Sequence, residues 1–176
     1  MPWLILIYTV PSEPSRKRAA VWRELKRVGA VYLRDGVCAL PERAETAVAL
    51  QAIAATIEGF DGRAILVEGA QLEDRHAQPI IDQSRAARAQ EYAEVARDAE
   101  GLLGHVRRET QHRAFTYAEL EELEADLGKL KRWYEQVRAR DYFAASTAGQ
   151  LEELLARCEV ALGAFLEEAA GREEAT

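Results

Sequence analysis

The first seventy residues alternate between short apolar runs and a longer stretch with helical periodicity. Trp3–Val10 is rich in Ile, Leu, Val and Tyr and stops at Pro11, which is typical of a strand buried on both faces. Between Ser15 and Val28 the apolar period becomes helical, and Gly29 follows, where glycine often ends a helix. The expected inner face of this helix consists of Val21, Trp22, Leu25 and Val28. The pattern therefore predicts a strand followed by a helix.

The next forty residues complete a compact unit of alternating elements. Ala30–Leu33 and Val37–Leu40 are predicted strands, joined by the hairpin signal Asp35-Gly36. Residues 43–58 have one apolar helical face, and Ala64–Val67 is a last continuous apolar run. The order strand, helix, strand, strand, helix, strand predicts a ferredoxin-like βαββαβ fold. Its four strands would form an antiparallel sheet with both helices on one face.

Beyond Gly69 the pattern is helical throughout. A long helix is predicted from about Pro79 to Arg108, a second from Thr116 and a third from near Thr147. The stretches "TYAE" and "TAGQ", which begin at the two threonines, both fit the capping box. Apolar residues of the second helix recur at coiled-coil spacing, which predicts an antiparallel hairpin with the preceding helix. They are Leu120, Leu123, Leu127, Leu130, Tyr134 and Val137.

These elements predict an α+β chain of two domains. Residues 1–69 would form the ferredoxin-like domain, and residues 70–176 an all-helical extension made of a helical hairpin and a third helix. The N-terminal part is basic although the chain as a whole is acidic. The first 41 residues carry seven Lys/Arg and three Asp/Glu, while the whole chain has a net charge of −7. The chain as a whole is therefore not a generic nucleic-acid binder, and an anionic partner is expected at the N-terminal part.

Cysteine usage and hydropathy indicate a reduced, cytoplasmic setting. Cys38 and Cys158 are far apart and in no metal-ligand spacing. The apolar run Trp3–Val10 has no basic residue before it and is too short to span a bilayer. We therefore expect a cytoplasmic protein without membrane insertion.

The densest basic cluster of the chain lies at the start of the first predicted helix. A helix N-terminus offers free N–H groups and a partial positive charge, so anions collect there, and arginine donates paired hydrogen bonds to tetrahedral oxyanions. Arg18 is the sharpest candidate, because its place at the start of the apolar stripe puts it at the edge between helix and sheet. A solvated helix end is the competing interpretation. The candidate oxyanion or phosphate site consists of Ser12, Ser15, Arg16, Lys17 and Arg18.

A second basic group lies on the outward surface of the same helix and in the following hairpin. Arginine and lysine side chains on such a surface can contact nucleic-acid phosphates. No recognition helix, winged helix or zinc finger is visible, so base reading has no evident element. A charged, solvated face is the competing interpretation of this pattern. The candidate nucleic-acid contacts, beside Arg16, are Arg23, Lys26, Arg27 and Arg34.

Metal binding and catalysis receive little support from the residue pattern. His105, Glu109 and His112 share one helical face and could hold a metal, but spacing fixes no third strong ligand, so we predict no metal site. Neither Cys38 nor Cys158 has a nearby histidine that would make it a nucleophile. The sequence has no Gly-rich phosphate loop, nucleophile elbow or paired-carboxylate signature. We predict no cofactor and no enzymatic activity.

Two long segments resemble the N-terminal domain of the ChrB family, bacterial proteins that regulate chromate resistance. They are "WLILIYTVPSEPSRKRAAVWRELKRVGAVYLRDGVCALPER" (Trp3–Arg43) and "FTYAELEELEADLGKLKRWYEQVRARDYF" (Phe115–Phe143). The early pattern is similar, more loosely, to the ferredoxin-like part of PaaX repressors and to small CRISPR-associated endoribonucleases. Those nucleases need an acidic residue at the end of the first strand, and here the strand ends Tyr8-Thr9-Val10. Nuclease activity is therefore not expected.

The resemblance implies a cytoplasmic, chromate-responsive regulator of a resistance operon. Together with the basic N-terminal part, it leads us to expect a homodimer that binds operator DNA. Chromate and sulfate are tetrahedral dianions that match the donors at the start of the basic helix. The alternative implied function is a small-oxyanion-binding or protein-interaction module that does not bind DNA. The enzyme alternative is a thiol-dependent chromate reductase that would use Cys38 or Cys158. Family members often carry a further C-terminal domain, and functions located there are not carried over.

Overall fold

The computed structural model describes residues 1–112 and 116–173. The elements in chain order are β1 (Trp3–Thr9), α1 (Ser15–Arg27), β2 (Val31–Arg34), β3 (Val37–Pro41), α2 (Ala44–Gly59), β4 (Arg63–Ala70), α3 (Asp74–His112), α4 (Tyr117–Arg138) and α5 (Ala148–Glu173). They form two compact units. Unit 1 contains Met1–Arg85 and Arg140–Phe143, and unit 2 contains Ala86–Ala139 and Ala144–Thr176.

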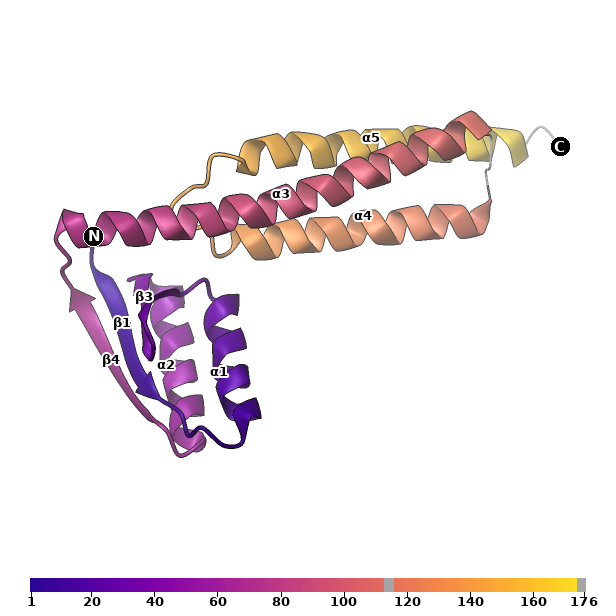
Figure 1. Cartoon of the computed structure of the whole chain (residues 1–176). Coiled ribbons are helices and arrows are strands. Elements are labelled where there is room, and N and C mark those ends of the chain that lie inside the picture. Colours follow the sequence, from indigo (N-terminus) through magenta and orange to yellow (C-terminus); the bar gives the residue numbers. More distant parts are fainter. Residues whose placement is uncertain (113–115, 174–176) are drawn as a thin grey trace. The chain divides into compact units, whose positions relative to one another are not determined.

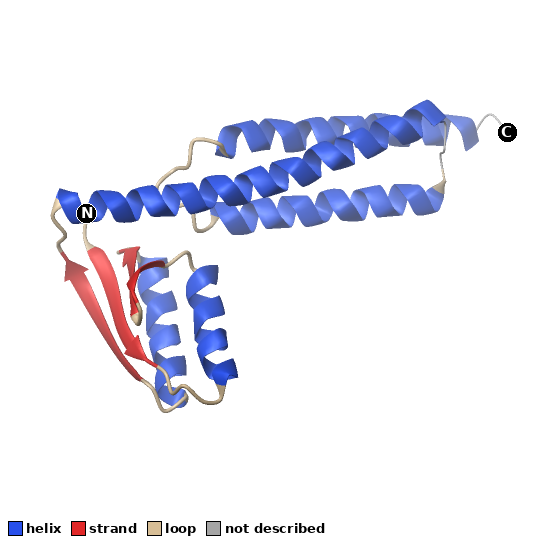
Figure 2. Cartoon of the chain, in the orientation of Figure 1, coloured by secondary structure: helices blue, strands red, loops and turns tan. Residues whose placement is uncertain are grey.

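Unit 1 contains the predicted four-stranded antiparallel sheet. The strand order is β2-β3-β1-β4, with Leu6 of β1 opposite Cys38 of β3 and Leu66 of β4. Helices α1 and α2 lie side by side on the same face of this sheet (Figures 1 and 2). The topology confirms the ferredoxin-like α+β prediction.

The two faces of the sheet pack against different parts of the chain. Because side chains alternate along a strand, Leu4 and Leu6 face the helices. They join a buried cluster with residues of α1, α2 and β3, among them Val21, Leu25, Leu50, Ile57 and Cys38. Trp3 points to the other face, where it packs with Ile80 of α3 and lies 5.8 Å from the ring of Phe143.

Residues 140–143 complete unit 1 although they lie far along the chain. The Tyr142 hydroxyl donates a hydrogen bond of 2.9 Å to the Val28 carbonyl. A guanidinium N–H of Arg43 donates to the Tyr142 carbonyl at 2.9 Å, and the guanidinium lies 5.2 Å from the centre of the Tyr142 ring. This short segment, which follows the end of α4, is therefore tied to both the end of α1 and the start of α2.

Two local expectations for the helices differ from the structure. Trp22 was expected on the inner face of α1 but is 52% exposed, whereas Val21 is 1% exposed. Adjacent residues are about 100° apart around a helix, so Trp22 falls at the margin of the stripe. The long helix α3 begins at Asp74, five residues before the expected start, and includes Pro79. Pro79 therefore lies in the second turn and not at the helix start, so its missing N–H removes one helical hydrogen bond, while the next residue, Ile80, packs in one cluster with Trp3.

Unit 2 is built from the larger part of α3 together with α4 and α5. Five of the six predicted heptad positions of α4 belong to its buried cluster, and Leu120 is partly buried against it. The five are Leu123, Leu127, Leu130, Tyr134 and Val137. The Thr116 hydroxyl caps α4 by accepting a hydrogen bond of 3.2 Å from the Glu119 N–H. Among the described residues, the buried Thr147 hydroxyl has no hydrogen-bond partner, so the cap predicted there does not form. No helix within residues 1–112 and 116–173 is long and apolar enough to cross a membrane.

Candidate functional site

The start of α1 lacks a side-chain cap. Pro14 occupies the cap position, and no side chain there accepts a hydrogen bond from the first turn. Ser12 and Ser15, both expected as oxyanion donors, are exposed. Free N–H groups and two nearby hydroxyls are therefore accessible at this end of the helix.

Lys17 does not extend into solvent beside its basic neighbours. Its ammonium donates hydrogen bonds to the Phe60 carbonyl and to an Asp61 carboxylate oxygen, each at 3.3 Å. The same ammonium lies 5.6 Å from the centre of the Phe60 ring. Lys17 therefore ties the start of α1 to the turn between α2 and β4, and Asp61 offsets part of its charge.

Arg18 lines an open cavity of about 560 Å³ in unit 1. The cavity lies where the end of β1 meets α1 and the β2–β3 turn, and its lining residues are Tyr8, Thr9, Val10, Arg18, Trp22, Tyr32, Asp35 and Gly36. The hydroxyls of Tyr8 and Tyr32 are hydrogen-bonded to each other at 3.1 Å. Burial is the main cause that raises the pKa of both tyrosines, so both phenols stay neutral near pH 7.

The charges that line this cavity are balanced. Among the described residues that line it, Arg18 is the only cation and Asp35 the only anion. An oxyanion there would gain hydrogen bonds from Arg18 but would be repelled by Asp35. The tyrosine pair was not singled out from the sequence. The alternation of side chains along a strand could have indicated Tyr8, because it puts Tyr8 on the same helix-facing side of β1 as Leu4 and Leu6.

The outward surface of α1 keeps several of its predicted cations accessible. Arg16, Arg23 and Arg34 are exposed, and none forms an ion pair with another described residue. Arg16 and Arg23 are seven residues apart and therefore lie on one face of the helix. This face therefore presents positive charge that no ion pair within the described part of the chain offsets.

The two remaining cations near the end of α1 have intramolecular partners. The Lys26 ammonium lies 5.9 Å from the centre of the Trp22 ring. An Arg27 nitrogen lies 3.9 Å from a Glu24 carboxylate oxygen, and both groups are partly solvated. Such exposed pairs contribute little to stability and open readily for a partner.

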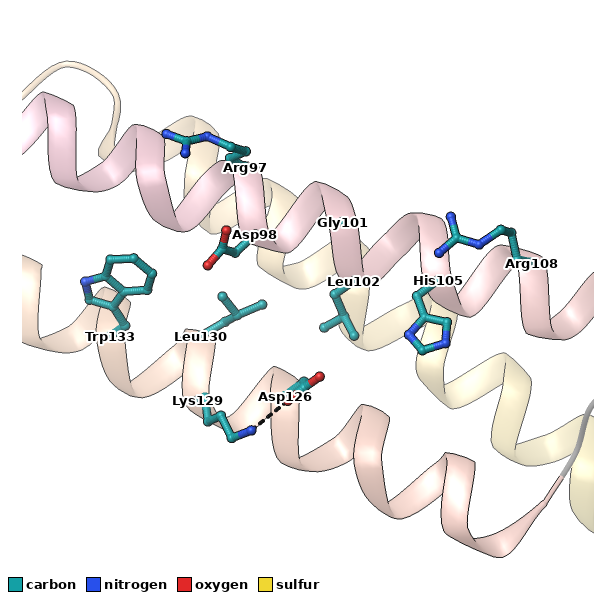
Figure 3. Close-up of a pocket in the computed structure, with 10 residues that line it drawn as sticks. All are labelled: Arg97, Asp98, Gly101, Leu102, His105, Arg108, Asp126, Lys129, Leu130 and Trp133. Atoms are coloured by element: carbon teal, nitrogen blue, oxygen red, sulfur yellow. Dashed lines mark hydrogen bonds and ion pairs between the residues drawn. The ribbon is translucent and has the colours of Figure 1, made fainter.

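Unit 2 contains a second open cavity, of about 580 Å³, between α3 and α4 (Figure 3). Its polar lining mixes both signs of charge: Arg97, Asp98, His105, Arg108, Asp126 and Lys129. Asp126 and Lys129 form an ion pair of 2.8 Å, and Trp133 adds an aromatic side chain. Of these residues only His105 stands out in the sequence, because the others are ordinary charged positions of amphipathic helices.

Both cysteines are buried in the apolar clusters of their units. Burial raises the pKa of the Cys38 thiol to about 12. Burial also raises the pKa of Cys158, whose sulfur lies 3.4 Å from the Ala99 carbonyl oxygen, to which it donates. Both thiols are therefore protonated near neutral pH, the form that is a poor nucleophile.

The chain matches the model of a known protein family. A family model described as "Protein ChrB, N-terminal" matches residues 18–174. The chain belongs to this family. The ChrB match spans both units and begins at Arg18, so that it includes Arg23, Arg27 and Arg34.

One curated relative shows the same relationship. Protein ChrB of Cupriavidus metallidurans is 32% identical to this chain over 92 residues, which is 52% of the chain and 28% of that relative. The match thus spans little more than a quarter of the relative's own length. The family assignment confirms the resemblance expected from the residues 3–43 and 115–143.

Proposed function

We propose that this chain is the N-terminal part of a chromate-responsive regulator of chromate resistance, which contacts operator DNA through the outward face of α1. The regulatory role is supported by membership of the ChrB N-terminal family. The observation that carries the DNA contact is the exposure of Arg16 and Arg23 on one helical face, without ion pairs among the described residues. Arg34 in β2 is a further exposed cation of the same unit.

Such a surface would supply affinity rather than base recognition. Each phosphate that an arginine neutralises releases condensed counterions, so binding weakens steeply as salt rises. Phosphate contacts position a protein on DNA but carry no direct sequence information. We therefore expect this unit to contribute a salt-dependent, weakly selective part of operator binding.

The DNA contact can be tested by fluorescence anisotropy with the promoter DNA of a chromate-resistance operon. In the double variant Arg16→Gln/Arg23→Gln, we expect the slope of log K against log[salt] to become shallower by about 0.9 for each phosphate that the protein no longer neutralises. The control is Arg107→Gln/Arg132→Gln, which removes two exposed arginines of unit 2 and changes the net charge equally. Absence of binding by the wild type at low salt, or equal weakening in the two variants, would refute the proposed DNA surface.

A second candidate function is oxyanion binding in the Arg18 cavity, which would give the regulator its chromate response or serve as a sensor without DNA contact. It is supported by the Arg18 guanidinium and the two neutral tyrosine hydroxyls that line one cavity. Calorimetric titration with chromate and with sulfate would test it. Arg18→Gln should abolish the binding heat, whereas Asp35→Asn should strengthen binding by removing the repulsive carboxylate. Unchanged heats in Arg18→Gln would remove Arg18 from the site.

The proposal includes a cytoplasmic location and a homodimeric state. Two copies would place two cationic helices on one DNA site, which raises the local concentration of the second contact. Size-exclusion chromatography with light scattering at several protein concentrations measures the oligomeric state. A monomer at all concentrations would contradict the proposed dimer. The DNA contact of a single copy would still be decided by the anisotropy measurement.

A further inference from the structure

Three side chains that can coordinate metal converge in unit 2. His105 and Glu109 lie four residues apart on one face of α3, and Glu119 comes from the first turn of α4. The Nε2 atom of His105 is 2.9 Å from a Glu119 carboxylate oxygen and 3.7 Å from a Glu109 carboxylate oxygen. One nitrogen or oxygen atom from each of the three lies within 4.8 Å of the other two.

We propose that His105, Glu109 and Glu119 form a binding site for a divalent transition-metal ion such as Zn²⁺. A mixed set of imidazole and carboxylate ligands suits Zn²⁺ and its neighbours in the first row, whereas Mg²⁺ and Ca²⁺ prefer oxygen alone. With metal–ligand bonds of about 2.0–2.2 Å, the ligand atoms of a tetrahedral site lie about 3.4 Å apart. The observed separations of 2.9 and 3.7 Å lie on either side of that value.

The backbone at the start of α4 holds one of these ligands in place. The Thr116 hydroxyl accepts a hydrogen bond from the N–H of Glu119, so the cap that begins the helix also fixes the backbone of the ligand residue. The other two ligands project from consecutive turns of a long helix. The three groups are therefore brought together by rigid elements, which favours a preorganised site.

The surroundings leave room for a further ligand. All three residues are partly buried rather than sealed from solvent. His105 also lines the cavity between α3 and α4, and its ring extends from α3 toward α4 (Figure 3). A water molecule can therefore complete the coordination of a metal held by three protein ligands.

The charges of the cluster also favour a dication. The two carboxylates of the cluster carry a formal charge of −2, which a divalent ion would neutralise. In the metal-free chain Nε2 of His105 lies 2.9 Å from a Glu119 carboxylate oxygen, and a metal bound at this nitrogen would take the place of that direct contact.

Cobalt titration of the full chain, prepared without a histidine tag, tests the site. Co²⁺ reports its coordination through visible absorption bands, and Zn²⁺ then displaces it if both share one site. We expect one Co²⁺ per chain, with bands that disappear on addition of Zn²⁺. Absence of bands in the wild type, or a stoichiometry that varies with excess metal, overturns the proposal whatever the variants do.

Ligand variants identify the residues. Glu119→Gln and Glu109→Gln should each weaken Co²⁺ binding at least about tenfold, because even residues that only support metal ligands have effects of this size. The matched controls are His112→Gln and Glu121→Gln, which change an exposed histidine on α3 and an exposed glutamate on α4. Circular dichroism confirms that each variant keeps its helices. Equal weakening in the controls would show diffuse binding to surface carboxylates and overturn the site.

Discussion

Replacing Gly36, in the turn between β2 and β3, with alanine should lower the stability of unit 1, and Gly69 in β4 provides a matched comparison. Gly36 has a φ of +70°, and its carbonyl accepts a hydrogen bond of 2.7 Å from the Tyr8 N–H. A Cβ atom added at Gly36 would lie 2.4 Å from the Tyr8 carbonyl oxygen. Gly69 has nearly the same φ, +66°, but a Cβ there would meet nothing within 4 Å. The two positions therefore share one backbone strain and differ in one steric contact.

The expected decreases in stability follow from that difference. Alanine in the left-handed region costs about 1–2 kcal/mol, and both variants incur it. At Gly36 the β2–β3 turn must also move away from β1, at a cost of about 1–3 kcal/mol, typical of overpacking. We expect Gly36→Ala to lower the free energy of unfolding of unit 1 by about 2–5 kcal/mol, and Gly69→Ala by about 1–2 kcal/mol.

Urea denaturation followed by tryptophan fluorescence measures both values. Trp3 and Trp22 lie in unit 1 and Trp133 in unit 2, so a Trp133→Phe background restricts the signal to unit 1. The transition midpoints of the two glycine variants are then compared at an unchanged m-value. Equal decreases would refute the close approach of Gly36 to β1. In that case backbone conformation alone would determine both effects.

Two further predictions concern buried and capping side chains. Burial raises the pKa of Cys38 to about 12 from an ordinary 9.0, so the thiol ionises first in the unfolded chain and its contribution to stability is lost as pH rises from about 9 to 12. The Cys38→Ala variant lacks this thiol, so the free energy of unfolding should depend less on pH, by up to about 1.4 kcal/mol per pH unit. Urea denaturation at about pH 8 and pH 10 measures the difference between variant and wild type. An unchanged pH dependence would contradict this prediction. Thr116→Ala should lower the thermal stability of unit 2 by about 1 kcal/mol because it removes a helix cap. Thr147→Ala should change it by less than about 0.5 kcal/mol, since its hydroxyl has no partner among the described residues, and equal effects would contradict the assignment of the caps.

Patterns that depend on neighbours in the chain could be predicted from the sequence. The apolar run of β1, the Asp35-Gly36 turn and the heptad of α4 each encode their element locally, and together they specify the βαββαβ order and the helical extension. The family resemblance rested on the amino-acid sequence of the segments that contain these elements. The Thr116 half of the predicted capping box is confirmed, because that contact joins residues three positions apart. The Glu119 carboxylate, the other half of the predicted box, lies 2.9 Å from Nε2 of His105 on another helix.

Features that depend on distant contacts could not be predicted in this way. Lys17 was grouped with Arg18 by adjacency, yet its ammonium pairs with Asp61, which lies 44 residues along the chain. His105 and Glu109 were noticed through their spacing on one helix, whereas Glu119 joins them only once two helices pack. His112, which shares the helical face of His105 in the sequence, is not in the cluster. Helical spacing defines a face but does not say which residue of another element meets it.

The place of Arg140–Phe143 in unit 1 has a consequence for synthesis on the ribosome. The last strand of the sheet ends at Ala70, but the segment that supplies the Tyr142 hydroxyl and the Phe143 ring is made much later. At translation rates of about 5–20 residues per second, the delay is roughly 4–15 s. During this interval the nascent sheet has its strands but lacks the aromatic cover over Trp3. Unit 1 is thus completed only after most of unit 2 has been translated, so the two units cannot mature strictly one after the other.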